Sequence, residues 1–271
     1  MSIKNFIPEL WSNRLMVPFK KSLVYGAVAN TDYQGEIKNA GDTVRINAIG
    51  PVTVTAYTGA TLTYEELNDE QQTLVIDQKN YFAFSVDDAD KAQAQAGYMD
   101  QGMSNAAYAI ANAADAYIAG LYTGAGSITV STAVNSVNVY AVILSLKQAL
   151  DENDVPKDGR WLILPPWLVT KLLLAKLLVE NTTNVAFENG FVGRVAGFDI
   201  YESNNVNNNG TTWNVMAGTR AAISYAGQFN EVEALRGEST FSDKVRGLNL
   251  FGAKVVYPDA LAVLTATVAA E

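Results

Sequence analysis

Alternating apolar and polar positions mark the first of two β-rich runs in the first third of the chain. From Gly41 to Tyr57, branched side chains alternate with polar ones, the pattern of a half-buried strand, and a second β-rich run extends from Thr73 to Val86. The intervening segment from Thr58 to Gln72 is too polar and acidic for a core. We therefore predict one long hairpin with an exposed acidic tip. It needs a surface to lie on, because an isolated two-stranded hairpin is only marginally stable.

Helical periodicity replaces this alternation in the middle of the chain. Aspartates at positions 87, 88 and 90 precede an alanine-rich stretch and are placed to cap a helix. They could instead bind a hard cation, but the spacing of a calcium-binding loop is absent. A helix from Asp88 to Leu121 would extend about 50 Å. Its expected apolar stripe is Met99, Met103, Ala106, Ile110, Ala113, Tyr117 and Leu121.

The second half of the chain mixes helical and β patterns. Ser136 to Leu150 predicts an amphipathic helix that buries Val139, Val142, Ile143, Leu146 and Leu150. A buried strand at 161–164 leads through Pro165 and Pro166 into a leucine-rich helix. An asparagine-rich turn covers 204–210. Further strands are predicted at 195–202, 213–216, 221–225, 232–235, 248–257 and 261–268. The fold class is therefore α+β.

The segment from Ser2 to about Asn39 is rich in large apolar side chains, and its first 25 residues carry an excess of basic ones. A proline at position 8 followed by apolar spacing predicts one short helix, and the remainder reads as extended chain. Such a terminus needs a partner surface. Its positive charge is explained either by a solvated face or by an arm that faces phosphate.

The amino-acid composition excludes most of the common catalytic mechanisms. The chain of 271 residues has no cysteine and no histidine, which excludes thiolate nucleophiles, imidazole bases and the common zinc sites. No phosphate-binding loop, dinucleotide-binding turn or nucleophile elbow is present. We predict no catalytic residue, no cofactor and no metal. A carboxylate-dependent hydrolase is disfavoured because 28 acidic residues make some close pair inevitable.

Charge and hydropathy also limit the partners. The net charge is −9, so the surface as a whole should repel phosphate. No secretory signal is recognisable, and the most apolar window, 161–179, is interrupted by prolines and lysines. We expect no membrane partner.

Several stretches, taken in order, resemble the major capsid (coat) proteins of tailed bacteriophages. They begin with IKNFIPELWSNRL and VYGAVANTDYQGEIKNAGDTVRINAIGPVTVTAY, and continue with LVIDQKNYFAFSVDDADKAQA and AYAIANAADAYIAGLY. GRWLILPPW, GFDIYESNNV, AAISYAGQFNEVEALR and GLNLFGAKVVYPDALAVLT follow. Each motif alone is weakly specific, but together they cover nearly the whole chain.

This resemblance implies the capsid fold of the HK-ninety-seven type. It maps an N-terminal arm to 1–40, an extended β-hairpin (E-loop) to 41–86, a peripheral domain with a long spine helix to 87–129 and 226–257, and an axial domain to 130–225 and 258–271. It implies a non-enzymatic protein that assembles into hexamers and pentamers of an icosahedral head, located in the virion capsid and built in the bacterial host cytoplasm.

The resemblance also implies partners. These are further copies of the chain, a scaffolding protein, a portal, in some relatives a decoration protein, and packaged double-stranded DNA held by non-specific contact. An encapsulin-like nanocompartment shell protein, a phage tail component and a carbohydrate-binding structural component remain as alternatives.

The residues expected at subunit interfaces come from the arm and the hairpin, because neither segment can form a core alone. They are Trp11, Arg14, Leu15, Val17, Phe19, Arg45, Tyr57, Tyr64, Glu65, Glu66, Asp69 and Glu70.

Overall fold

A computed structural model describes residues 23–32, 43–49, 69–87, 98–176, 190–236 and 241–269. The helices are α2 (Tyr25–Val28), α4 (Tyr98–Ala119), α5 (Val139–Glu152) and α6 (Pro166–Leu174), with 3₁₀ turns η3 (Gly120–Gly124) and η5 (Pro258–Ala260). The first strands are β1 (Thr43–Ile49), β2 (Asp69–Val75), β3 (Gln78–Asp87), β4 (Ser127–Val134), β5 (Arg160–Leu164) and β6 (Phe191–Val195). They are followed by β7 (Phe198–Glu202), β8 (Thr212–Thr219), β9 (Ile223–Arg236), β10 (Ser242–Val255) and β11 (Leu261–Val268).

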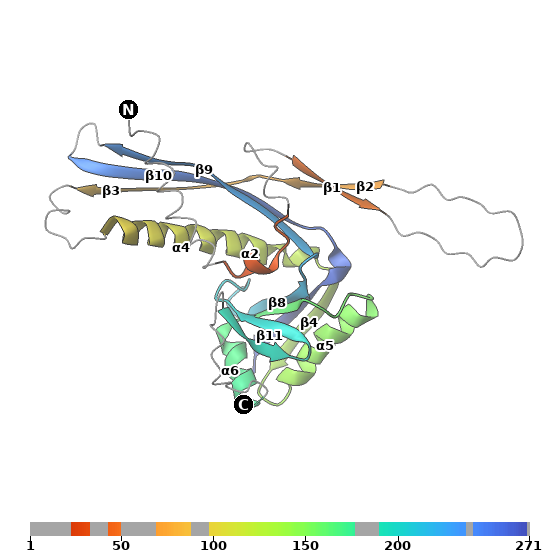
Figure 1. Ribbon diagram of the computed structural model, residues 1–271. Helices are drawn as coiled ribbons and strands as arrows, with labels where there is room; N and C mark the ends of the chain where they lie inside the picture. The colour runs from red at the N-terminus through yellow and green to blue at the C-terminus, as the bar shows by residue number, and fades with distance from the viewer. Residues whose placement is uncertain are drawn as a thin grey trace, which may run out of the picture.

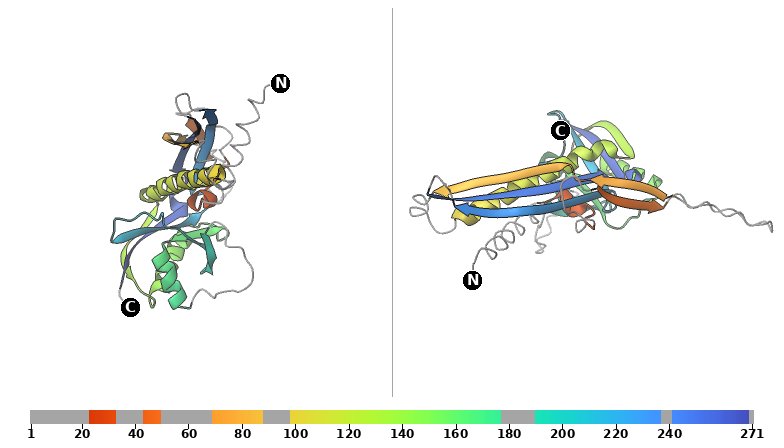
Figure 2. Two further views of the ribbon diagram at one scale, coloured as in Figure 1. Left: turned by 90° about the vertical axis from the view of Figure 1, so that its left-hand side faces the viewer. Right: turned by 90° about the horizontal axis from the view of Figure 1, so that it is seen from above.

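One layer of the molecule is an antiparallel sheet in the order β3–β10–β9, which lies along α4 (Figures 1 and 2). Strand β3 alternates between half-buried and exposed side chains along its whole length, as the period of two requires. Two of its half-buried side chains, Phe82 and Phe84, pack toward the core that contains α4. Gly102 of α4 lies directly against the Phe84 ring, so the small residue lets the helix approach the sheet.

A second, mixed sheet has the strand order β4–β11–β8–β5–β7–β6. Strand β5 is buried over its whole length, as expected for a strand covered on both faces. Trp161 and Ile163 join the core shared with α4, whereas Leu162 and Leu164 join the core beneath α5 and α6. The alternation of β5 therefore places helices α5 and α6 on one face of this sheet and α4 on the other side (Figure 1).

The third unit is the base of a hairpin in which β1 pairs antiparallel with β2, from Thr43 opposite Val75 to Ile49 opposite Asp69. Ile46 and Leu74 from this hairpin form a separate small cluster with Ala226 and Leu250 of the long strands β9 and β10. The hairpin thus rests on the three-stranded sheet rather than standing alone, which supplies the support that its marginal stability requires.

Several sequence predictions are confirmed. Helix α5 buries all five predicted residues, the strand before Pro165 is present, and the asparagine-rich segment is a turn stabilised by side-chain acceptors such as the Asn209 Oδ1 atom. These patterns succeed because local spacing alone determines them.

Other predictions need correction. The run from Thr73 to Val86 does not pair entirely with the first run, because its second half, β3, pairs with β10 instead. On α4 the buried positions include Ala107, Ala111 and Ala114, whereas Ala113 is exposed. Alanine contributes little to a periodic pattern, so the predicted stripe is displaced around the helix. The predicted start of this helix, 88–97, lies outside the described residues.

Two strand features were missed. Strand β4 falls in a stretch for which no strand is predicted above, although its branched residues are typical of one. The predicted strand at 195–202 is a hairpin whose turn residues Ala196 and Gly197 both have positive φ, +54° and +91°, as in a tight type I′ turn. Only the glycine signals such a turn in the sequence.

Candidate subunit-contact surface

The candidate surface lies on the face of the β3–β10–β9 sheet that points away from α4, and is called the outer face below. The alternation of β3 turns Tyr81, Ala83 and Ser85 toward this face. The register places Leu248 opposite Tyr81 and Arg246 opposite Ala83. Tyr81 is 80% exposed and Leu248 37% exposed, so large apolar groups from neighbouring strands remain open to solvent.

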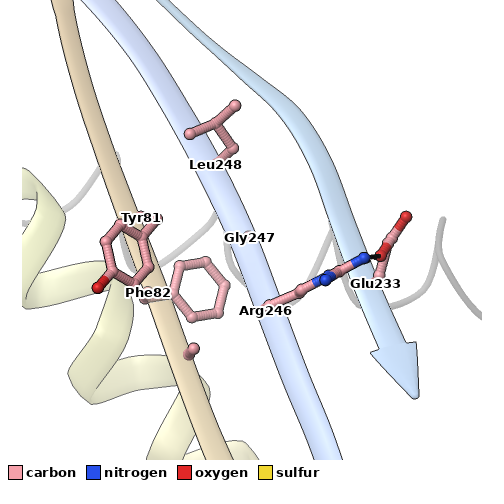
Figure 3. Close-up of a pocket in the computed structure, with 7 residues that line it drawn as sticks. Tyr81, Phe82, Glu233, Arg246, Gly247 and Leu248 are labelled. Atoms are coloured by element: carbon pink, nitrogen blue, oxygen red, sulfur yellow. Dashed lines mark hydrogen bonds and ion pairs between the residues drawn. The ribbon is translucent and has the colours of Figure 1, made fainter.

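A pocket in this surface is bounded by Tyr81 and Leu248 on one side and by an ion pair on the other (Figure 3). The Arg246 Nε and Nη2 atoms both contact Oε2 of Glu233, at 2.8 and 2.6 Å. Both side chains are substantially exposed, so the pair adds at most about 1 kcal/mol to stability. Its main effect is to hold the guanidinium group in one position at the rim of the pocket.

The strand segments at Gly247 and Phe82 also line the pocket, while the Phe82 ring itself lies on the opposite face of the sheet, toward α4. A Cβ atom at position 247 would overlap that ring, so only glycine lets the ring pack against β10 there. On the outer face the pocket is lined by Tyr81, Ala83 and Leu248 and by the single Arg246–Glu233 ion pair. Such a surface suits a partner that contributes an apolar side chain and a few hydrogen bonds.

The other half of the outer face is already covered. There, Leu250 and Ala226 contact Ile46 and Leu74 from the base of the chain's own hairpin. The outer face therefore has one part that the hairpin base covers and one part that stays exposed, and both parts present apolar side chains. The uncovered part includes Leu235 from β9, which is also exposed.

A buried carboxylate anchors the N-terminal end of the described chain. Asp115 of α4 accepts hydrogen bonds from the backbone amides of Val24 and Gly26, at 2.7 and 3.1 Å. It thereby caps α2, whose own N-cap residue supplies no side-chain bond. Burial raises the pKa of Asp115 to about 6, against the lowering effect of these amides. The nearby Tyr25 and Tyr225 hydroxyls are buried, and burial together with the Asp115 charge raises the pKa of both.

The predicted interface residues are only partly described. Arg45 is exposed on β1. Asp69 and Glu70 belong to β2, opposite Ile49 and Ala48, and not to the hairpin tip. The remaining predicted residues lie outside the described residues: Trp11, Arg14, Leu15, Val17, Phe19, Tyr57, Tyr64, Glu65 and Glu66.

Sequence reasoning missed Tyr81, Leu235 and Leu248. A signal was available for Tyr81, because an aromatic side chain interrupts the polar phase of the β3 alternation.

Within the described ranges, no group of three or more acidic side chains is arranged to hold a metal ion. No described helix is long and apolar enough to cross a membrane.

Comparison with known proteins places this geometry in a family. A model of the phage capsid protein family matches residues 69–265. A structure from Mycobacterium phage Che8 is 27% identical, with a TM-score of 0.72, 89% of this chain covered and 90% of that chain. The capsid structure of the cyanophage P-SCSP1u is 17% identical, with a TM-score of 0.67 and coverages of 93% and 88%.

A virus-like particle from Pyrococcus furiosus has the same fold at 15% identity, with a TM-score of 0.61 and coverages of 95% and 99%. No curated protein sequence gave a match. The fold is thus shared beyond phages, and the family match is what favours a phage capsid protein over the nanocompartment alternative.

A long helix under an extended sheet, a hairpin on the sheet's outer face and an uncovered apolar surface beside it define the subunit of a protein shell with the HK-ninety-seven-type fold. The chain belongs to the phage capsid protein family, and it is a major capsid protein that forms the phage head. Its copies associate with one another in the virion capsid.

Proposed function

We propose that the chain forms hexamers and pentamers of an icosahedral head, and that the hairpin and arm of one subunit cover the outer face of a neighbour. The exposed Tyr81 beside the pocket is the observation that carries this proposal. In the same subunit, another part of this face, at Ala226 and Leu250, is covered by the chain's own hairpin base. A second hairpin would extend that apolar contact across the uncovered part.

The energetics favour covering this face. Full burial of a large apolar side chain contributes about 1.5–3 kcal/mol. Tyr81, Leu235 and Leu248 lie on three adjacent strands, so one extended segment can cover all three. A contact of this size is weak for one pair of subunits but becomes strong when repeated around a closed shell.

We further propose the division into arm, hairpin, peripheral and axial parts, and a purely structural role without catalysis. Double-stranded DNA is the proposed content, held without tight adhesion because the chain carries a net charge of −9. A scaffolding protein, a portal and a decoration protein are the proposed partners during assembly in the host cytoplasm.

The test is a charge placed on the outer face. Tyr81→Glu should leave the subunit folded, because the side chain is exposed, but should reduce the yield of closed shells at least about tenfold. A cost of about 1.4 kcal/mol weakens one such contact tenfold, and the cost is repeated at every affected contact of the shell. Yield is measured by sedimentation and negative-stain electron microscopy, and folding by circular dichroism.

Tyr81→Phe is the matched control. It keeps the ring and removes only the hydroxyl, so it should assemble like the wild-type chain. Shells formed by Tyr81→Glu at the wild-type yield would show that the outer face is not a subunit contact.

A further inference from the structure

Helix α5 exposes a row of large apolar side chains. Val137, just before the helix, is 89% exposed, and Tyr140 and Leu144 follow at spacings of three and four residues. Such spacings place side chains on one side of a helix. The core-facing side of α5 is formed by other residues, from Val139 to Leu150, so this row is additional to the helix's own packing.

Helix α6 exposes a second apolar group at its C-terminal end. Leu174 is 58% exposed, and Leu173 next to it is also exposed. The residue that packs this part of the helix into the core is Leu172. The two leucines are therefore not needed by the described core either.

The two apolar groups lie at different positions on the same domain. Helix α5 packs over β4 and β11, at one edge of the six-stranded sheet. Helix α6 follows β5, nearer the other edge, and shares one face of the sheet with α5, so that α6 lies toward the left and α5 toward the right of this domain in Figure 1. A subunit with two different exposed apolar surfaces can bind the next copy head to tail, the first surface of one copy against the second surface of the other. Such heterologous contacts form a ring when the rotation between copies closes.

The charges beside the two groups are complementary. The exposed row on α5 continues to Gln148 and Glu152, which are hydrogen-bonded to each other at 2.7 Å. The exposed end of α6 carries Lys171 in its last turn and is followed by Lys176. The Glu152 carboxylate at the end of one apolar row and the exposed Lys176 beside the other favour pairing of α5 with α6 over pairing of either helix with its own copy.

We propose that, within a ring of subunits, the Val137–Leu144 row of one copy packs against the Leu173–Leu174 end of α6 in the next copy. This inference rests on the proposed hexamers and pentamers, and it assigns the two surfaces that hold each ring together. The same contact repeats at every subunit boundary, so each copy uses its α5 row once and its α6 end once.

The absence of cysteine from the chain allows a clean cross-linking test on assembled particles. The double variant Leu144→Cys with Leu174→Cys is treated with a short bismaleimide and separated on a denaturing gel. We expect a ladder of covalent products that ends at the pentamer and hexamer. Each single variant should stay monomeric, because a heterologous contact brings together two different surfaces.

Ser104→Cys combined with Leu174→Cys is the matched control, since Ser104 is exposed on α4, and it should give no ladder. Dimers from Leu144→Cys alone would overturn the inference by showing that α5 meets its own copy. Should the first pair fail to assemble, Tyr140→Cys with Leu173→Cys repeats the test.

If a double-cysteine variant assembles into shells but gives no cross-linked products, the inferred α5–α6 contact is wrong. The proposed function as a shell protein is not affected by that result. If both pairs fold but neither forms particles, while a ladder still appears in solution, the contact is supported without a shell. Folded pairs that give neither particles nor a ladder count against the contact. The absence of shells from the wild-type chain itself would instead contradict the proposed function.

Discussion

Asp115 fixes the position of α2 against α4. Its carboxylate is almost completely buried and accepts the backbone amides of Val24 and Gly26. Burial of a charge is costly unless it is compensated, and here burial dominates, since the pKa rises from 3.8 to about 6. One side chain of α4 therefore determines where the chain that follows the N-terminal segment joins the folded body.

This pKa predicts an unusual pH dependence. A carboxylic acid with a raised folded-state pKa stabilises the fold fully below its unfolded pKa of 3.8 and loses that contribution as pH rises through about 6. Compared with Asp115→Asn, the unassembled wild-type subunit should therefore gain about 1 kcal/mol of unfolding free energy between about pH 7.5 and about pH 5. Urea denaturation of both proteins at the two pH values measures the difference. A constant difference, or one that shrinks on acidification, contradicts the assignment.

Residue-scale prediction from sequence worked where one helix determines its own burial. On α5, every predicted core residue is buried, because large aliphatic side chains give a clear period. It failed for Tyr81, since alternation distinguishes two faces of a strand but does not say which face a second subunit covers. Asp115 was also missed, because the amides that it caps lie about 90 residues earlier.

At the scale of elements, the hairpin base is held by a small core of its own. Leu74 is fully buried in the cluster with Ile46 and Leu250, while the adjacent Val75 is exposed. This cluster is separate from the two larger cores. The orientation of the hairpin therefore depends on few residues.

Leu74→Ala should loosen the hairpin without unfolding the rest of the subunit. Truncation of a buried leucine costs about 2–5 kcal/mol, and the loss should be confined to this cluster, so amide hydrogen exchange in Thr43–Ile49 should accelerate while α5 stays protected. Val75→Ala is the control and should leave exchange nearly unchanged. Equal acceleration in β1 and α5 would show that the hairpin base does not unfold independently.

Element-scale prediction was limited by pairing. The β-character of the run from Thr73 to Val86 was evident, but β2 pairs with β1 whereas β3 pairs with β10, more than 150 residues away. Strand propensity carries no information about such distant partners. For the same reason β4, which pairs only with the C-terminal strand β11 in the described sheet, went unassigned.

At the scale of the whole molecule, the sequence predicted the class of protein because ordered motifs cover nearly the entire chain. The absence of histidine and cysteine also favoured a structural protein, because it excludes most catalytic side-chain arrangements. The contact surfaces could not be predicted in this way, since they depend on two copies and on side chains brought together from β3, β9 and β10. They require the fold before they can be located.

A single-particle reconstruction of shells assembled by the full chain tests the central claim most directly. The account predicts closed shells in which a segment of a neighbouring subunit covers Tyr81, Leu248 and the Arg246–Glu233 pair of every subunit. Shells in which this outer face is open to solvent in every subunit, or an assembly-competent preparation that yields only monomers, would contradict it.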